Sequence, residues 1–206
     1  MTAQVNTAQL TAMMQDARQR TLELVDGLSA DQLMGPKIRT VNPLRWEIGH
    51  VAYWYEYFIL RSLDGEKSLL GARADELYDS IAVVHDTRWD LPLLSLEETL
   101  GYMQGVMDRL VDRLGTINHD ILASEEDSFI YQFGIFHEDM HTEAFLWARQ
   151  SLAYPTPRLA MARDVTVERA AGPWPGYAEI PGGKFRMGAE RDAPFLFDNE
   201  KYAHEV

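Results

Sequence analysis

Apolar residues recur at helical spacing in four separate stretches of the chain. The first stretch repeats them every three or four positions, which is the pattern of a helix with one face against a core. Ser29, with Gln32 three residues later, is typical of a helix cap and predicts a short helix over residues 30–34. The first stripe consists of Leu10, Met14, Ala17, Thr21, Leu24 and Leu28.

The next two stretches begin at recognisable helix starts. Asn42-Pro43 predicts a helix with Asn as its N-cap and Pro at its first position. This helix is apolar on nearly all sides as far as Leu63, so we expect it to be buried among other helices. Ser95, with Glu98 three residues later, predicts a further helix over residues 96–114 with a regular apolar seam.

Helical periodicity fails between residues 64 and 94, where glycine, proline and aspartate predict a long ordered loop. Loops of this length inside compact domains are often functional. The fourth apolar stretch, residues 128–152, predicts another helix, which ends before Pro155. Four helices joined with one long crossover predict an all-α four-helix bundle.

The character of the chain changes after residue 153. Residues 154–176 are rich in proline and glycine and predict a partly extended linker, and residues 177–188 have the pattern of a hairpin-forming β segment. Residues 177–206 are too few for a sheet domain, so we expect them to pack poorly alone and to open a second domain. The predicted organisation is a helical domain over 1–153, a linker over 154–176 and this fragment over 177–206.

Charge and composition narrow the classes of partner. The 206 residues carry a net charge of −13, with 32 acidic residues spread along the chain. Nucleic acids and anionic membranes bind basic surfaces, so neither is expected as a partner. These residues contain neither a signal-peptide pattern nor a membrane-spanning run, and the expected location is the cytoplasm. Cysteine is absent, so a metal would have to be bound by His, Asp or Glu.

His137 and His141 are the most informative residues of the fourth helix. A separation of four residues places both imidazoles on one face of a helix, and the small Gly134 and Ala144 leave space beside them. Two imidazoles need a third ligand from elsewhere, and His50, in the apolar second helix, is the candidate. Three histidines would leave coordination positions open for chemistry.

Two other interpretations of these histidines stay open. In a metal-free binding or assembly bundle each buried imidazole needs its own partner, and an unpaired one costs about 1–3 kcal/mol. His137-Glu138-Asp139-Met140-His141 also fits the pattern of a zinc peptidase, but the usual continuation is missing, since Ala144 and Trp147 occupy those positions. Glu138 is expected either to face solvent or to orient one of the histidines by a hydrogen bond without binding the metal itself.

Aromatic residues near His50 and in the long loop are further candidates for the site. Trp46 and Tyr53 share one side of the second helix with His50. We expect Trp46 to support the metal ligands and Tyr53 to contact substrate. Arg88-Trp89 lies in the aromatic part of the loop, where a guanidinium suits an anionic group of a small substrate. An ion pair of the arginine with a neighbouring aspartate, Asp86 or Asp90, is the alternative.

Trp46-Glu47-Ile48-Gly49-His50 and His137-Glu138-Asp139-Met140-His141 resemble the DinB-like domain of the ergothioneine sulfoxide synthases and the related selenoneine synthases. The segment Ile180-Pro181-Gly182-Gly183-Lys184-Phe185-Arg186-Met187-Gly188 resembles the start of their second domain. That domain is of the formylglycine-generating-enzyme type, with a C-type-lectin-like fold. The resemblance covers the whole chain, and the combination of histidines and tail is more specific than the histidines alone.

The resemblance implies a mononuclear non-haem Fe(II) on His50, His137 and His141. It also implies O2, hercynine and a selenosugar or thiol donor as substrates, joined by a C–Se or C–S bond at the imidazole of hercynine. The loop around Arg88-Trp89, and Asp139-Met140 in place of the usual glutamines, depart from the ergothioneine type, and the loop looks more like the selenoneine branch.

The resemblance places the residues that contact hercynine and a catalytic tyrosine in the second domain, so we expect these 206 residues alone to be inactive. A DinB-type metal-dependent thiol transferase or zinc hydrolase would use the same three histidines and stays open as an alternative. A metal-free binding bundle is the third class.

Overall fold

The computed structural model describes residues 5–116, 125–160, 175–193 and 195–206. The chain divides into two compact units, one covering residues 4–159 and the other lying from residue 160 onward. The placement of one unit relative to the other is not determined, so each is described by itself.

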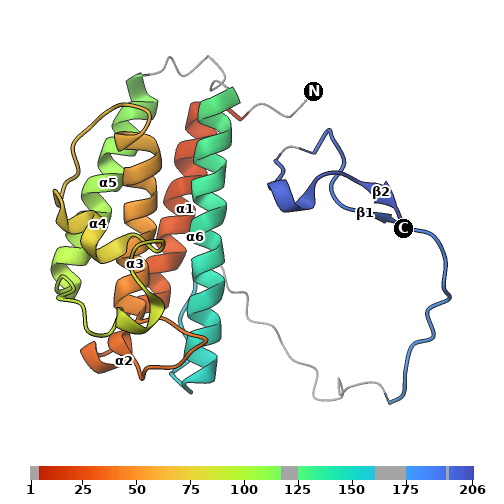
Figure 1. The fold of residues 1–206 in the computed structure, drawn as a ribbon, viewed down its shortest axis with the longest axis horizontal. Helices are drawn as coiled ribbons and strands as arrows, with labels where there is room; N and C mark the ends of the chain where they lie inside the picture. Colours follow the sequence, from red (N-terminus) through yellow and green to blue (C-terminus); the bar gives the residue numbers. More distant parts are fainter. Residues whose placement is uncertain (1–4, 117–124, 161–174, 194) are drawn as a thin grey trace. The chain divides into compact units, whose positions relative to one another are not determined.

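Four long helices pack side by side in the first unit: α1 (Thr7–Val25), α3 (Leu44–Tyr55), α5 (Leu96–Thr116) and α6 (Glu125–Ser151). Helix α1 packs against α6 and α5, and α3 packs against the same two helices. Figure 1 shows that α1 and α6 run in one direction, whereas α3 and α5 run in the other. The predicted helical bundle is therefore confirmed, with a crossover between two parallel helices.

The first five members of the first apolar stripe, from Leu10 to Leu24, lie on the buried face of α1, as predicted, and Leu28 lies in the turn after its end. All six members of the stripe are at most 9% exposed. Ser29 caps the short helix α2 (Ala30–Met34), and its hydroxyl accepts from the backbone N–H of Gln32, while the Gln32 side chain accepts from the Ser29 N–H. The same reciprocal cap joins Ser95 and Glu98 at the start of α5. These local signals were sufficient because each is complete within four residues.

The second predicted helix differs from the structure at both ends. Pro43, not Asn42, is the N-cap of α3, because the Asn42 side chain is used elsewhere: it donates to Glu47 and accepts from Arg88. At its other end α3 continues as a π-helix, η1 (Glu56–Arg61). The apolar pattern that predicted one straight α-helix does not distinguish the two hydrogen-bond registers.

The predicted loop over residues 64–94 is ordered, but it also contains two short helical elements. It contains α4 (Arg73–Tyr78) and the 3₁₀ turn η2 (His85–Thr87). Helix α4 packs on α3, and the buried side chains of Leu77 and Tyr78 explain why this short amphipathic segment is stable. The crossover thus lies against the helix that carries His50.

The second unit contains one antiparallel pair of short strands among its described residues. Strand β1 (Arg186–Met187) pairs with β2 (His204–Glu205), with a 3₁₀ turn, η3 (Asp198–Glu200), between them. The predicted β segment over residues 177–188 contains β1, and the partner of β1, for which the sequence pattern made no prediction, lies near residue 205. Residues 161–174 of the predicted linker lie outside the described residues.

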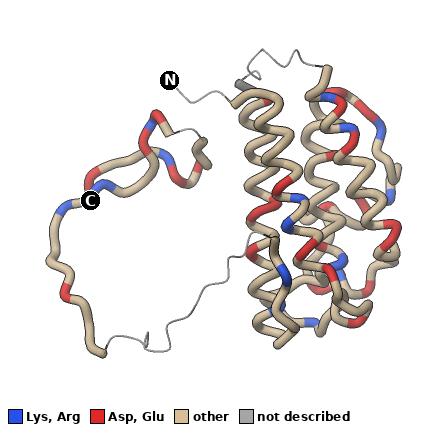
Figure 2. The backbone as a smooth tube through the Cα atoms, turned by 180° about the vertical axis from the view of Figure 1, so that it is seen from behind, with Lys and Arg blue, Asp and Glu red and all other residues tan. Residues whose placement is uncertain are grey.

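Figure 2 shows Lys and Arg interleaved with Asp and Glu along the described helices. Some of these charges pair between elements: Arg113 of α5 contacts Asp127 of α6 and Asp64, which lies in the turn after η1. Within the described part of the chain, no helix has the length and apolarity that a bilayer crossing requires.

Candidate metal centre

Two glycines let the elements around His50 approach closely. A Cβ on Gly134 of α6 would lie 2.4 Å from the Tyr55 ring and 2.9 Å from the Trp54 ring of α3. A Cβ on Gly49 of α3 would lie 2.2 Å from the ring of Tyr78, at the end of α4. Real Cβ atoms do not approach other atoms so closely, so any other residue would push these elements apart.

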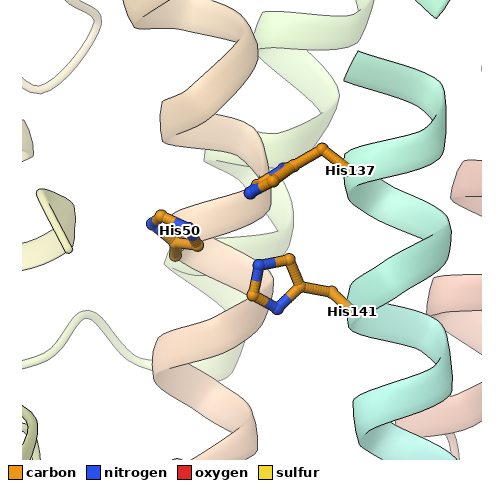
Figure 3. A group of neighbouring side chains, drawn as sticks. All are labelled: His50, His137 and His141. Carbon is orange, nitrogen blue, oxygen red and sulfur yellow. The ribbon is translucent and has the colours of Figure 1, made fainter. Parts of the chain in front are cut away.

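His50, His137 and His141 converge between α3 and α6 (Figure 3). One ring nitrogen from each lies within 4.8 Å of one from each of the others. The ring centroids are 5.3 Å apart for His50 and His137, 5.0 Å for His50 and His141, and 4.7 Å for His137 and His141. Among the described residues this is the group of His, Asp and Glu whose atoms could hold one metal ion.

Burial keeps two of these imidazoles neutral. Desolvation, followed by the nearby His141, lowers the pKa of His50 from 6.5 to about 4. Desolvation, followed by His141 and His50, lowers the pKa of His137 from 6.5 to about 2. Both rings therefore carry a free lone pair at neutral pH, which is the form that binds a metal.

Neighbouring groups leave ring nitrogens available at the centre. The Nδ1 of His50 lies 2.8 Å from the backbone oxygen of Tyr78. A carbonyl only accepts, so Nδ1 carries the proton and Nε2 keeps the lone pair. Among the described residues, the buried Nδ1 of His137 has no hydrogen-bond partner, and the buried Nδ1 of His141 lies 3.5 Å from an oxygen of Glu47. Unpaired buried nitrogens are costly, so the residues present fit an ion that prefers imidazole ligands.

Tryptophan rings flank two of the three histidines. Trp46 stacks on His50, with centroids 4.8 Å apart and planes 8° from parallel, and its indole N–H donates to the Leu77 oxygen at 2.6 Å. Trp54 stacks on His137 at 5.2 Å. These contacts hold the imidazole planes and shield them from water.

The predicted substrate residue Arg88 lies one ring away from the histidines. Its guanidinium carbon is 3.8 Å from the centroid of the Trp46 ring, and Trp46 in turn stacks on His50. It donates to Asn42 Oδ1 at 2.7 Å and to the backbone oxygens of Ser80 and Val83. The structure therefore pairs Arg88 with an amide and two carbonyls, not with Asp86 or Asp90.

Trp89 and Tyr53 use their polar atoms in contacts with the protein. The Trp89 indole donates to the oxygens of Met34 and Gly35, each at 3.1 Å. The Tyr53 hydroxyl donates to Asp75 at 3.0 Å. In the described part of the chain, no interaction joins either residue to the three histidines.

Glu138, one residue after His137, lies in a different cluster. It is fully buried and accepts from Arg18 Nε at 2.8 Å and from the Thr21 hydroxyl at 2.8 Å, both on α1. It therefore neither faces solvent nor bonds to one of the three histidines. Arg18 was missed in the sequence, although it falls within the apolar stripe of α1, where an arginine needs a buried acid.

Glu47 was also missed as a neighbour of the histidines. It is 3% exposed, and its Oε1 lies 3.5 Å from His141 Nδ1. Its position in the apolar second helix, one turn before His50, was the available signal, because a buried acid requires a partner.

Comparison with known proteins places the chain in a family. Residues 13–145 match the model of the DinB superfamily. The chain is 31% identical over 92% of its length to a hercynine oxygenase of Mycolicibacterium smegmatis, and 32% identical over 96% to one of Mycobacterium tuberculosis. A hercynine oxygenase of Mycolicibacterium thermoresistibile is 32% identical over 97% of the chain.

The alignments cover 43–45% of those relatives, so the chain spans less than half the length of the proteins it matches. The residues that match the family model, by contrast, include all of α3 and α5 and the two turns of α6 that carry His137 and His141. The chain belongs to the DinB superfamily.

Proposed function

We propose that this chain is the metal-binding part of a non-haem Fe(II), O2-dependent enzyme acting on hercynine. The reaction forms a C–Se or C–S bond at the imidazole of hercynine, with a selenium donor preferred to a thiol. One observation carries the proposal: three buried imidazoles converge in a chain that is similar, over more than nine-tenths of its length, to proteins named hercynine oxygenase.

His50, His137 and His141 are the proposed ligands. Neutral imidazoles suit iron, zinc, copper and nickel, and three of them leave the charge of a divalent ion uncompensated and coordination positions open. When bound, Fe(II) would supply the one-electron chemistry that reaction with O2 requires. The chain's own contribution is to hold the rings of His50 and His137, by the Trp46 and Trp54 stacks and the Tyr78 carbonyl.

Arg88, Trp89 and Tyr53 are the proposed substrate contacts, with Arg88 for the anionic group of the selenium or sulfur donor. Geometry supports Arg88 best, because its guanidinium touches Trp46, which in turn touches His50. The selenium preference rests on the sequence of the crossover around residues 78–92, which is similar to that of the selenoneine branch.

Anaerobic titration with Fe(II) tests the first step. One ion per chain is expected for the native protein and none for His137→Ala, because the two histidines that remain are not enough to hold the ion. Unchanged stoichiometry in that variant would refute the three-histidine site.

Oxygen consumption with hercynine tests the reaction. The Fe(II)-loaded chain, alone and joined to the C-terminal part of a hercynine oxygenase, is given hercynine with either a selenosugar or glutamylcysteine, and donor-dependent O2 uptake is measured. We expect little or no uptake by the 206 residues alone, and uptake by the joined form that is faster with the selenium donor. Binding of Zn²⁺ alone, with thiol transfer or hydrolysis and no effect of hercynine on a bound ferrous ion, would favour a different DinB-type enzyme.

A further inference from the structure

Glu47 is a buried carboxylate that faces the candidate metal centre from α3. It is 3% exposed, and its Oε1 lies 3.5 Å from Nδ1 of His141, on the neighbouring helix α6. This distance is longer than a good hydrogen bond. The His141 nitrogen it faces is itself buried and has no hydrogen-bond partner among the described residues. A buried acceptor and a buried ring nitrogen therefore lie next to each other, each incompletely bonded.

The carboxylate has capacity for another donor. The hydrogen bond it accepts within the described residues comes from the Asn42 amide, at 2.8 Å to Oε1. An ionised carboxylate has about four acceptor positions, and its burial is costly unless they are used. An imidazole N–H from His141 is the donor that this geometry offers.

The position of Glu47 is held from the crossover. Asn42 donates to Glu47 through Nδ2 and accepts from Arg88 through Oδ1, at 2.7 Å. The guanidinium carbon of Arg88 also lies 3.8 Å from the centroid of the Trp46 ring. Hydrogen bonds from Arg88 to Asn42 and from Asn42 to Glu47 thus connect the loop to the neighbourhood of His141. A second connection runs from Arg88 through the Trp46 ring to His50.

We infer that Glu47 is a positioning residue for His141. The inference rests on the proposed function, in which His141 is a metal ligand. Metal-binding histidines commonly donate their other ring N–H to a carboxylate or carbonyl, which fixes the tautomer and makes the ligating nitrogen more basic. His50 has such an acceptor in the Tyr78 carbonyl, and Glu47 supplies the corresponding, negatively charged acceptor for His141.

Metal affinity of Glu47→Gln tests the inference. The probe is Co²⁺, added to the full chain and measured by competition with a chelator and by its visible absorption spectrum. Loss of a carboxylate partner of this kind typically weakens metal binding 10- to 100-fold, and we expect a loss of at least about tenfold with an altered Co²⁺ spectrum. Asn42→Ala, which leaves the carboxylate but removes its support, should give a smaller loss in the same direction.

Glu56→Gln is the matched control. Glu56 is also a fully buried carboxylate in the same continuous helical segment, but it binds Ser68, Leu69 and Tyr102. It should lower the unfolding temperature and leave Co²⁺ affinity within about twofold, because its partners belong to the crossover and α5. This separates loss of a buried carboxylate from loss of the His141 partner.

The outcomes distinguish the two proposals. If native protein binds Co²⁺ and both Glu47→Gln and Asn42→Ala bind it equally well, the role of Glu47 is refuted and the three-histidine site stands. If native protein binds no Co²⁺, the proposed function fails and the inference fails with it. Should Glu47→Gln not fold, the Asn42→Ala affinity and spectrum decide the matter.

Discussion

His137 and Glu138 are neighbours on α6, yet they lie in two buried clusters of opposite character. The Glu138 cluster is complete within the protein: the carboxylate accepts from Arg18 and Thr21, and Arg18 also donates to the Met103 oxygen. The His137 cluster is incomplete among the described residues: the buried Nδ1 of His137 has no hydrogen-bond partner, and the buried Nδ1 of His141 lies 3.5 Å from Glu47.

This difference gives a physical criterion for separating structural from functional polar groups. A buried polar group whose bonds are all made within the chain stabilises the fold, and α6 is bound to α1 in this way at Glu138. A buried group whose bonds are not made lowers stability, and such groups are retained where a ligand completes them. Changes to the two clusters should therefore have opposite consequences for unfolding and for metal binding.

Glu138→Leu should have the largest effect on stability. The substitution leaves Arg18, which is 6% exposed, with a buried charge and no acid, and breaking such a pair costs about 3–5 kcal/mol. Urea unfolding followed by circular dichroism measures the change. A loss below about 1 kcal/mol would show that the Arg18–Glu138 cluster does not hold α1 to α6.

Acidification of the metal-free protein should weaken the histidine cluster selectively. The pKa values of His50 and His137 are about 4 and about 2 in the folded chain, against 6.5 for an unperturbed histidine. The unfolded chain therefore binds more protons below pH 6.5, so the free energy of unfolding falls as pH drops from about 6.5 towards 4.

The expected loss between pH 7 and pH 5 is about 2 kcal/mol for each histidine whose shift is fully retained. Unfolding curves at a series of pH values measure this slope. His137→Leu should have a shallower slope, because it removes one of the two groups. Equal slopes in both proteins would contradict the burial of a neutral His137.

Gly134→Ala should have an intermediate effect on both properties. The new Cβ would lie 2.4 Å from Tyr55, and overpacking of this kind costs about 1–3 kcal/mol. Because it separates α6 from α3, it should also weaken metal binding. Thermal unfolding and Co²⁺ titration measure the two effects.

Gly101→Ala on α5 is the control for that substitution. A Cβ at Gly101 meets nothing within 4 Å, so the change should stabilise the helix by about 0.5–1 kcal/mol, through reduced backbone entropy. Metal binding should not change. Equal destabilisation by both substitutions would mean that the close approach at Gly134 has no special role.

His137→Leu should have the smallest effect on the metal-free protein, within about 1 kcal/mol. It removes a buried nitrogen without a partner, and apolar replacement of such a group is nearly neutral. The contrast with Glu138→Leu, at the next residue, is the sharpest form of the comparison. Metal should raise the unfolding temperature of the native protein and leave that of His137→Leu unchanged.

The helices and the histidines could be predicted because their signals are short in sequence. Caps such as Ser29 with Gln32 are complete within four residues, and the His137–His141 spacing fixes a common helix face. The convergence of His50 on this pair needed only the assumption that two apolar helices pack together.

The partners of these groups could not be predicted, because they depend on packing between distant segments. Glu47 lies near His141 only because α3 and α6 approach at Gly134. Likewise, Asn42 has the composition of an N-cap, but its side chain binds Arg88, 46 positions later. The pairing of β1 with β2 could not be predicted for the same reason, since the two strands are separated by a segment that contains the turn η3.

The parallel course of α3 and α5 has a consequence for how the site depends on chain connectivity. Two parallel neighbours cannot be joined by a tight turn, so the chain must return along the whole bundle between residues 62 and 95. That return path carries the Tyr78 carbonyl to His50 and Arg88 to Trp46. A bundle with the same four helices in strict up-and-down order would have no reason to place any backbone there. The support of the histidines is thus a product of the order in which the chain visits its helices.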